Sequence, residues 1–327
     1  MKSEPSSADT VELIVPADLD GVRADRVVAT LLGLSRAAAR LAVDGGHVVS
    51  GSTTVEAADK LPAGALVVVT RPTEAYGLVP LEHDLSIVYE SAAVLVVDKP
   101  PGLVVHPGAG HRNDTLANVL IWHYPELAGL GEEHRWGLVH RLDRDTSGAL
   151  IVGRTAAAHE TLQAQLKRRE IARVYVALVN GQIDPATGTI EAPIGRDPEH
   201  PTKMALRQDG RFARTHYRRL AAWQELSLLE VRLDTGRTHQ IRVHLSSIKA
   251  PIVGDKTYGL RRATAGNPGR VWLHARSVTF VDPAEGQLAQ PRTVTAPLPS
   301  DLLESLAKLG EPSSGGVPAD VAGGSAS

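Results

Sequence analysis

The sequence contains no cysteine in its 327 residues. Disulfide bonds, catalytic thiolates and cysteine-ligated metal sites are therefore excluded, and any covalent nucleophile must be an oxygen or a nitrogen atom. The sequence also has no run of about 18 apolar residues, the length that a membrane-spanning helix needs. The first ten residues are polar and lack the apolar core of a secretory signal. These absences predict a cytoplasmic protein without a membrane segment.

Positive and negative charges nearly cancel, because the formal net charge is −2. A uniformly basic coat for nucleic acid is therefore absent. The basic residues are instead concentrated locally, since residues 161–220 hold 11 Lys and Arg against 6 Asp and Glu. Such a surplus is typical of an ordinary solvated face, and next to a nucleic-acid site it would form a track for phosphates.

The length and the apolar content allow one large domain and one small one, each with its own core. A Pro-bearing stretch after residue 71 is typical of a linker. We therefore expect a small domain at residues 11–72, a linker at 73–84 and a large domain at 85–309. The tails, 1–10 and 310–327, are expected to be disordered, because the second is rich in Gly, Ser, Ala and Pro and cannot bury a core.

The small domain has the pattern of an α/β unit. Apolar residues between 24 and 31 lie on one face of a predicted helix, and Ser35 can cap a second helix over 36–43. Strands are expected at 46–51 and 66–69.

The large domain mixes apolar strands with helices, which predicts an α+β fold. A helix is expected from Thr155, which can cap it, to Arg168. Buried strands are expected at 94–97, 149–152, 174–179 and 226–233.

The segment GLVHRLDRDTSG, residues 137–148, places Asp143 between two apolar stretches expected to be short buried strands, 137–139 and 149–152. Asp, Thr and Ser also form ordinary turns in which they only bond local backbone amides, and for a lone motif that interpretation is favoured. A second polar cluster, residues 235–244 (TGRTHQIRVH), is equally dense in polar side chains. Two such clusters indicate a shared site.

The segments HRLDRDTSG and RTHQIRVH resemble two motifs of the RluA/RluD-type RNA pseudouridine synthases. The resemblance covers residues 85–309, where further segments follow in the order of the family. These are VDKPPGLVVHPG (97–108), RVYVALV (173–179), PIGR (193–196), KMA (203–205) and THYR (215–218). Residues 11–72, with LSRAAAR at a helix start, resemble the S4 RNA-binding domain.

The resemblance implies a mixed, mainly antiparallel sheet with a central cleft, plus the small S4-like domain. It implies isomerisation of uridine to pseudouridine in a stem-loop of large-subunit (23S) rRNA, without a cofactor. Asp143 would then be the catalytic group, and attack on ribose C1′, attack on uracil C6 and proton abstraction all remain open. Arg242 would pair with Asp143 and keep it charged. Tyr175, which by itself is more typical of a core residue, would stack on the uracil and assist proton movement.

RNA contacts are expected in both domains. Arg141 would fill the space left by the flipped uridine, and Ile241 would form an apolar wall. Arg36 and Arg40 lie four residues apart on one helical face. The expected contacts are Arg141, Ile241, Arg36, Arg40, Lys203 and Arg237. The expected partner is large-subunit rRNA or its assembly intermediate, bound by a monomer that contributes to ribosome biogenesis.

Other functions remain possible at this point. The family also contains tRNA pseudouridine synthases, and a non-catalytic ribosome-assembly factor would keep the fold without needing the three catalytic residues. A glycosidase would need Asp145 as the carboxylate partner of Asp143, whereas Asp145 is better explained as a turn residue. His239 and His244 are five residues apart, unlike the pair of an HExxH motif, so no metal is expected.

Overall fold

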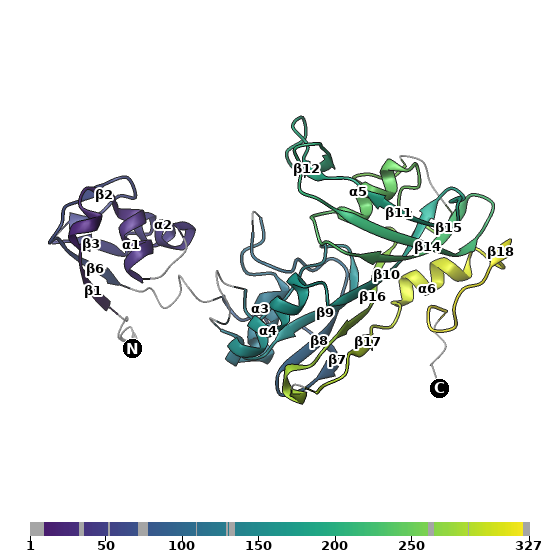
Figure 1. The fold of residues 1–327 in the computed structure, drawn as a ribbon, viewed down its shortest axis with the longest axis horizontal. Helices are drawn as coiled ribbons and strands as arrows, with labels where there is room; N and C mark the ends of the chain where they lie inside the picture. Colours follow the sequence, from purple (N-terminus) through teal and green to yellow (C-terminus); the bar gives the residue numbers. More distant parts are fainter. Residues whose placement is uncertain are drawn as a thin grey trace, which may run out of the picture. The chain divides into compact units, whose positions relative to one another are not determined.

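A computed structural model describes most of the chain (Figure 1). The described residues are 10–32, 36–51, 53–70, 78–108, 110–128, 130, 135–260, 265–286 and 288–322. Residues 1–9 of the predicted N-terminal tail and residues 73–77 of the predicted linker lie outside them, as does Ser35. The chain divides into two compact units, Met1–Pro80 with Ala128–Trp136 and Leu81–Leu127 with Gly137–Ser327.

The first unit packs two helices on a small antiparallel sheet. Its elements are β1 (Thr10–Ile14), η1 (Ala17–Leu19), β2 (Val22–Arg23), α1 (Ala24–Leu32), α2 (Arg36–Asp44), β3 (Val48–Ser50), β4 (Thr53–Thr54), β5 (Lys60–Leu61) and β6 (Leu66–Thr70). The sheet order is β1-β6-β3-β4, and β2 pairs with β5. Both predicted helices and both predicted strands are confirmed as α1, α2, β3 and β6, whereas Thr10 begins a strand instead of ending a tail.

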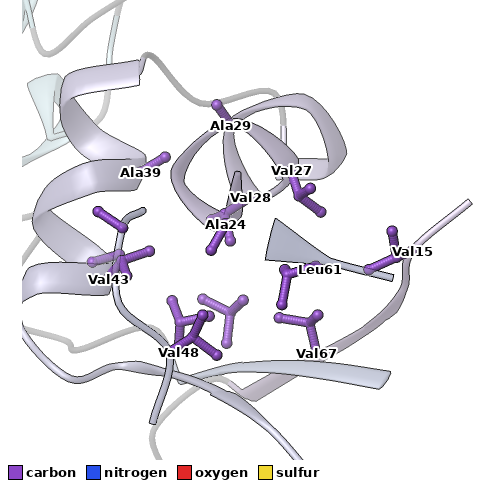
Figure 2. Packing of buried hydrophobic residues seen from close by; sticks show 14 residues of the cluster. Val15, Ala24, Val27, Val28, Ala29, Ala39, Val43, Val48, Leu61 and Val67 are labelled. Carbon is purple, nitrogen blue, oxygen red and sulfur yellow. The ribbon is translucent and has the colours of Figure 1, made fainter. Parts of the chain in front are cut away.

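Aliphatic side chains from α1 meet side chains of the sheet in the core of this unit (Figure 2). Val27 and Val28 of α1 are fully buried, as are Val48 of β3 and Val67 of β6. The predicted apolar face of the first helix is therefore the face that packs on the sheet.

The second unit contains the remaining elements. Its strands are β7 (Ser86–Glu90), β8 (Val94–Lys99), β9 (Ser147–Gly153), β10 (Ala172–Asn180), β11 (Thr187–Glu191), β12 (Ile194–Arg196), β13 (Met204–Leu206), β14 (Arg214–Ala222), β15 (Leu226–Leu233), β16 (Leu273–Phe280), β17 (Arg292–Thr295) and β18 (Ser314–Gly315). Its helices are α3 (Leu116–His123), η2 (Pro125–Leu127), α4 (Ala156–Lys167), α5 (Gln240–Ser247), η3 (Pro283–Glu285) and α6 (Ser300–Ala307). None of the helices in the described ranges is long and apolar enough to cross a membrane.

Ten of these strands form one sheet in the order β11-β14-β15-β10-β16-β9-β8-β7, with β17 on β16 and β18 on β14. All pairs are antiparallel except β16 with β9. One edge of β16 is divided, because β9 pairs with its first residues and β17 with its last. The α+β class and the mainly antiparallel sheet are confirmed. β12 and β13 form a separate hairpin, which projects beyond the sheet in Figure 1.

Four predicted strands and one predicted helix of this unit are confirmed as β8, β9, β10, β15 and α4. The oxygen Oγ1 of Thr155 caps α4 by accepting a hydrogen bond from the backbone N–H of Ala158 at 3.1 Å. The predicted strand at 137–139 is wrong. Leu138 forms only an isolated bridge to Val152, because Gly137 has a φ of 75°, outside the extended region of a strand.

The prediction that the tail from residue 310 is disordered is wrong for residues 310–322. β11 pairs only with Arg214–Arg218, and β18 pairs with the rest of that edge of β14, at Ala221 and Ala222. Val321 is 1% exposed. The composition was misleading because strand pairing uses backbone N–H and C=O groups, which Ser and Gly supply as well as apolar residues do.

A buried histidine joins the start of β16 to β9. The side chain of His274 is fully buried; Nε2 donates to the carbonyl oxygen of Ala296 at 3.2 Å and Nδ1 accepts from the hydroxyl of Ser147 at 3.0 Å. Burial lowers the pKa of His274 to about 4 from 6.5, so the ring is neutral at pH 7.

We expect acid to destabilise the fold through His274. Below pH 6.5 the unfolded chain binds a proton at this residue that the folded chain binds only near pH 4, so the free energy of unfolding falls by up to about 3 kcal/mol across that window. In urea unfolding from pH 7 to 4, the His274→Gln variant should be less stable than the wild type at pH 7 and show a shallower decline. Parallel declines for the two proteins would contradict the assignment.

Candidate active site

Asp143 lies in a tight turn immediately before β9. The backbone N–H of Thr146 donates to the carbonyl oxygen of Asp143 at 3.1 Å, which closes the turn. The turn enters β9 through Gly148, whose φ is 113° and where an added Cβ would lie 2.2 Å from the carbonyl oxygen of Ala275. Only glycine fits there, so β9 can approach β16 closely and the turn is fixed at the edge of the sheet.

Two cations hold the carbonyl groups of this turn. Lys99 is fully buried, and its Nζ donates to the carbonyl oxygens of Arg144 at 3.0 Å, Leu103 at 2.9 Å and Pro100 at 2.6 Å. Three acceptors match the three donors of an ammonium group.

Arg270 holds the other side of the turn. It donates to the carbonyl oxygen of Asp145 at 3.1 Å and to Oγ of Ser147 at 3.3 Å, while Asp301 of α6 binds its Nε and NH2 at 2.6 and 3.0 Å. We name Lys99 and Arg270 the turn clamps. Because they bind consecutive backbone carbonyls, they restrict the position from which Asp143 projects.

The structure brings Arg242 of α5 into contact with Asp143. Arg242 NH1 donates to Asp143 Oδ2 at 3.1 Å, and the two side chains are 11% and 17% exposed. Arg242 also forms a two-bond contact with Asp255, at 2.7 Å from Nε and 2.9 Å from NH2. Its guanidinium carbon lies 5.1 Å from the centre of the Tyr258 ring. Asp255 therefore orients Arg242 and leaves one nitrogen for Asp143.

The pair of Arg242 and Asp255 stays ionised although it is buried. Burial by itself would raise the pKa of Asp255, but Arg242 and the backbone N–H groups of Thr257 and Tyr258 hold it below its usual value. Burial would lower the pKa of Arg242, and the two carboxylates raise it above the usual value. The resulting charge beside Asp143 is permanent at any ordinary pH.

Tyr175 and Ile241, the two predicted apolar contacts of the base, are both buried. Both are 5% exposed, Tyr175 on β10 between Val231 and Ala275 and Ile241 on α5. Burial, above all, raises the pKa of Tyr175, with Arg173 lowering it and Asp143 raising it further. The phenol is therefore neutral at ordinary pH and close enough to Asp143 to sense its charge.

The predicted RNA-contact residues differ in their exposure and in their bonding partners. Arg141 is exposed. The pKa of His239 is lowered mainly by burial; the charge of Asp143 raises it and the charge of Arg141 lowers it. Arg237 donates to the carbonyl oxygen of Phe212 at 3.0 Å. Lys203 lies between β12 and β13. In the first unit Arg40 pairs with Asp44 at 3.3 Å, and the side chain of Arg36 lies outside the described part.

The local basic surplus is partly neutralised by neighbouring carboxylates, which the sequence did not predict. Four of its arginines form ion pairs of 2.6 to 3.1 Å. The pairs are Arg168 with Glu170, Arg207 with Asp209, Arg214 with Glu191 and Arg218 with Glu230.

The two histidines considered as metal ligands have other bonds. His239 Nδ1 lies 2.9 Å from the hydroxyl of Tyr258, and His244 contacts Oγ1 of Thr215 and the carbonyl oxygen of Ala192. Within the ranges that the structure describes, no three His, Asp or Glu side chains gather as metal ligands would.

Sequence reasoning missed Asp255 and the turn clamps. Asp255 lies 13 residues after Arg242 in a short glycine-containing turn, VGDKTYG, that resembles any surface turn. Lys99 and Arg270 act on backbone carbonyls, which leave no mark in a sequence.

The chain is similar to several known proteins. The family model described as RNA pseudouridylate synthase matches residues 93–247. The chain is 44% identical over 302 residues to an RNA pseudouridine synthase of Chloroflexus aurantiacus, covering 91% of this chain and 93% of the relative. It is 40% identical over 324 residues to ribosomal large subunit pseudouridine synthase D of Xanthomonas campestris pv. campestris, covering 95% and 96%. The solved structure of human RNA pseudouridylate synthase domain containing 1 is similar, with 29% identity, a TM-score of 0.55, and 67% of this chain and 87% of that chain covered.

We expect Asp255→Asn to destabilise the protein by about 3 kcal/mol, because it leaves the buried guanidinium of Arg242 without its two-bond carboxylate. Asp209→Asn is the matched control: Asp209 binds Arg207 through two bonds of 2.7 Å, but its side chain is 68% exposed. Its loss should therefore change the free energy of unfolding much less than the loss of the Asp255 carboxylate does. Urea unfolding at pH 7 measures both, and equal effects would show that burial of the Asp255 pair is unimportant.

Proposed function

The chain belongs to the RluA/RluD-type RNA pseudouridine synthases, enzymes that isomerise uridine in RNA, and we propose that its substrate is a stem-loop of large-subunit (23S) rRNA and that Asp143 is the catalytic nucleophile. The reaction breaks the bond between uracil N1 and ribose C1′, joins C1′ to C5, and replaces the C5 proton by a proton on N1. Substrate and product have the same composition, so one oxygen nucleophile and a proton transfer are sufficient.

The observation that carries the proposal for Asp143 is its single contact with Arg242. Among the described residues only Arg242 donates a hydrogen bond to this carboxylate, through Oδ2, so Oδ1 can approach a substrate. The other two carboxylates nearby differ. Asp255 is fully buried with both oxygens bonded, and Asp145 has both oxygens bound to Arg144. Asp143 combines a fixed cation with a free oxygen, as a nucleophile requires.

The neighbouring side chains support roles in positioning the base. The ring of Tyr175 supplies a stacking surface for a flipped uracil, and its neutral hydroxyl can take part in moving the C5 proton. Ile241 supplies a second apolar wall. Arg141, exposed at the rim, is suited to occupying the gap that the flipped uridine leaves in the RNA.

The proposed rRNA substrate rests on a relative and on the first unit. The Xanthomonas relative carries the name of a ribosomal large subunit enzyme and matches nearly the whole chain. The first unit resembles an S4 domain in sequence, and we propose that it provides a second RNA contact. The guanidinium side chain of Arg40 remains 60% exposed despite its pair with Asp44, so a phosphate can compete for it.

We expect Asp143→Asn to lower kcat by a factor on the order of 10⁴ or more, because an amide cannot act as the nucleophile, while RNA binding stays within about threefold of the wild type. Asp145→Asn, in the same turn, should retain activity. The measurement is pseudouridine mapping of large-subunit rRNA from cells that lack the protein and are complemented with each variant. If the Asp143→Asn variant restores the pseudouridines, Asp143 is not the nucleophile. Loss of activity in Asp145→Asn alone would favour a paired-carboxylate mechanism.

We expect Arg270→Gln to lower kcat by about tenfold to a hundredfold with little change in KM for RNA, because the turn that carries Asp143 loses one clamp. Arg292→Gln is the control. Arg292, on β17, forms an ion pair with Glu285 at 2.5 Å, and among the described residues it donates to no carbonyl of the turn. Steady-state kinetics on a purified stem-loop transcript separate the two constants. A change in KM alone would assign Arg270 to RNA binding instead.

A further inference from the structure

Arg173, on β10, is a buried cation without a carboxylate. It is 8% exposed, and among the residues that the structure describes it forms no ion pair and no hydrogen bond through its Nε. Arginine stays protonated in proteins, so this arrangement buries a full charge. Other arginines of similar burial are compensated: Arg242 by two carboxylates and Arg270 by Asp301.

Arg173 lies next to the proposed active site. Its charge acts on Tyr175, two residues along β10, where the charge of Asp143 also acts. It also acts on His140, three residues before Asp143. The guanidinium of Arg173 therefore lies within electrostatic range of both His140 and Tyr175.

A second unpaired donor lies in the same region. His140 Nε2 accepts a hydrogen bond from the backbone N–H of Ile151 at 3.1 Å, so the ring proton is assigned to Nδ1. The backbone of Arg141 interacts with the ring, but Nδ1 has no partner at hydrogen-bond distance within the described chain. Burial, and then Arg173, lowers the pKa of His140 to about 3, so the ring is neutral. Both unsatisfied groups are donors, and neither has a carboxylate as a hydrogen-bond partner among the described residues.

An approach to Arg173 exists at Gly236, in the polar cluster before α5. Gly236 is exposed, and a Cβ added to it would lie 2.8 Å from Arg173 NH1. The absence of a side chain at residue 236 therefore keeps the end of the guanidinium open to a ligand from outside.

We propose that Arg173 is a phosphate-binding residue of this site, which holds, over Gly236, a backbone phosphate of the RNA next to the target uridine. This inference rests on the proposed action on RNA. A phosphodiester oxygen supplies the negative acceptor that the buried guanidinium lacks, and a guanidinium binds it with charge-assisted hydrogen bonds. The residue positions the nucleotide and takes no part in bond breaking.

The test measures binding of a stem-loop transcript at several KCl concentrations, with the full chain carrying Asp143→Asn so that the RNA is not converted. Arg173→Gln should weaken binding about tenfold to a hundredfold. It should also reduce the slope of log affinity against log salt by about 0.7 to 0.9, the loss of one phosphate contact. Arg173→Lys should keep the slope. The control Arg232→Gln, exposed at 64% and paired with Glu230, should change neither quantity.

Turnover separates positioning from chemistry. With Asp143 intact, Arg173→Gln should raise KM while kcat stays within about threefold. An unchanged salt slope overturns the proposal. If kcat falls in that case, Arg173 acts on the electrostatics of Asp143 and Tyr175. If affinity falls instead, Arg173 contacts a neutral group of the base. A wild-type chain that neither binds nor converts the transcript would instead refute the proposed function.

Gly236→Ala provides an independent variant if Arg173→Gln does not fold. Its backbone φ lies outside the positive range, so alanine is tolerated and the methyl group meets only Arg173 NH1 within 3 Å. We expect the same loss of salt slope, and no further loss when Gly236→Ala is combined with Arg173→Gln. Additive losses, or no loss in Gly236→Ala, would rule out the approach over Gly236.

Discussion

The site depends on a guanidinium that two carboxylates share unequally. Arg242 gives two nitrogens to Asp255 and one to Asp143, and this asymmetry decides what each carboxylate can do. Asp255 is saturated and serves as an anchor, whereas Asp143 receives one bond and keeps Oδ1 without a hydrogen bond among the described residues. Buried ion pairs contribute little net stability, because desolvation offsets the attraction. The value of the pair therefore lies in orientation. A lysine, which has one nitrogen, could not reproduce a planar arrangement of three donors.

Asp255 fixes a side chain, that of Arg242, whereas Lys99 and Arg270 fix backbone carbonyl groups of the turn. Lys99 and Arg270 approach the turn from opposite ends of the second unit's sequence and bind carbonyl oxygens that follow Asp143 directly. Arginine stays protonated in proteins, so Arg270 adds to the field around Asp143 as well as fixing its backbone. Burial lowers the pKa of Lys99 to about 7 from 10.5. The end of a central strand and two clamps therefore fix the backbone from which the carboxylate projects.

Much of this arrangement was predictable where chemistry requires a particular side chain. Asp143 and Arg242 stand in dense polar motifs, and the continuous apolar runs of β8, β9, β10 and β15 identify buried strands. Prediction failed where backbone conformation or backbone pairing determines the local structure. The segment 137–139 is not a strand, because Gly137 has a positive φ. The tail from residue 310 is ordered because its backbone pairs with β14. Asp255 was missed because a lone Asp in a turn has no distinguishing pattern. Two ion pairs of the basic segment, Arg214 with Glu191 and Arg218 with Glu230, were missed because they depend on strand register.

The parallel pair of β16 with β9 determines when the site can form during protein synthesis. His274 pairs with Ser147 across more than a hundred residues of chain, and Arg270 needs Asp301 from the last helix. Contacts this distant in sequence form late, after the intervening chain has been made. A partly synthesised chain can therefore hold the first unit folded while the turn with Asp143 is still unsupported. The turn that carries Asp143 gains its full support only when the chain has been made as far as Asp301.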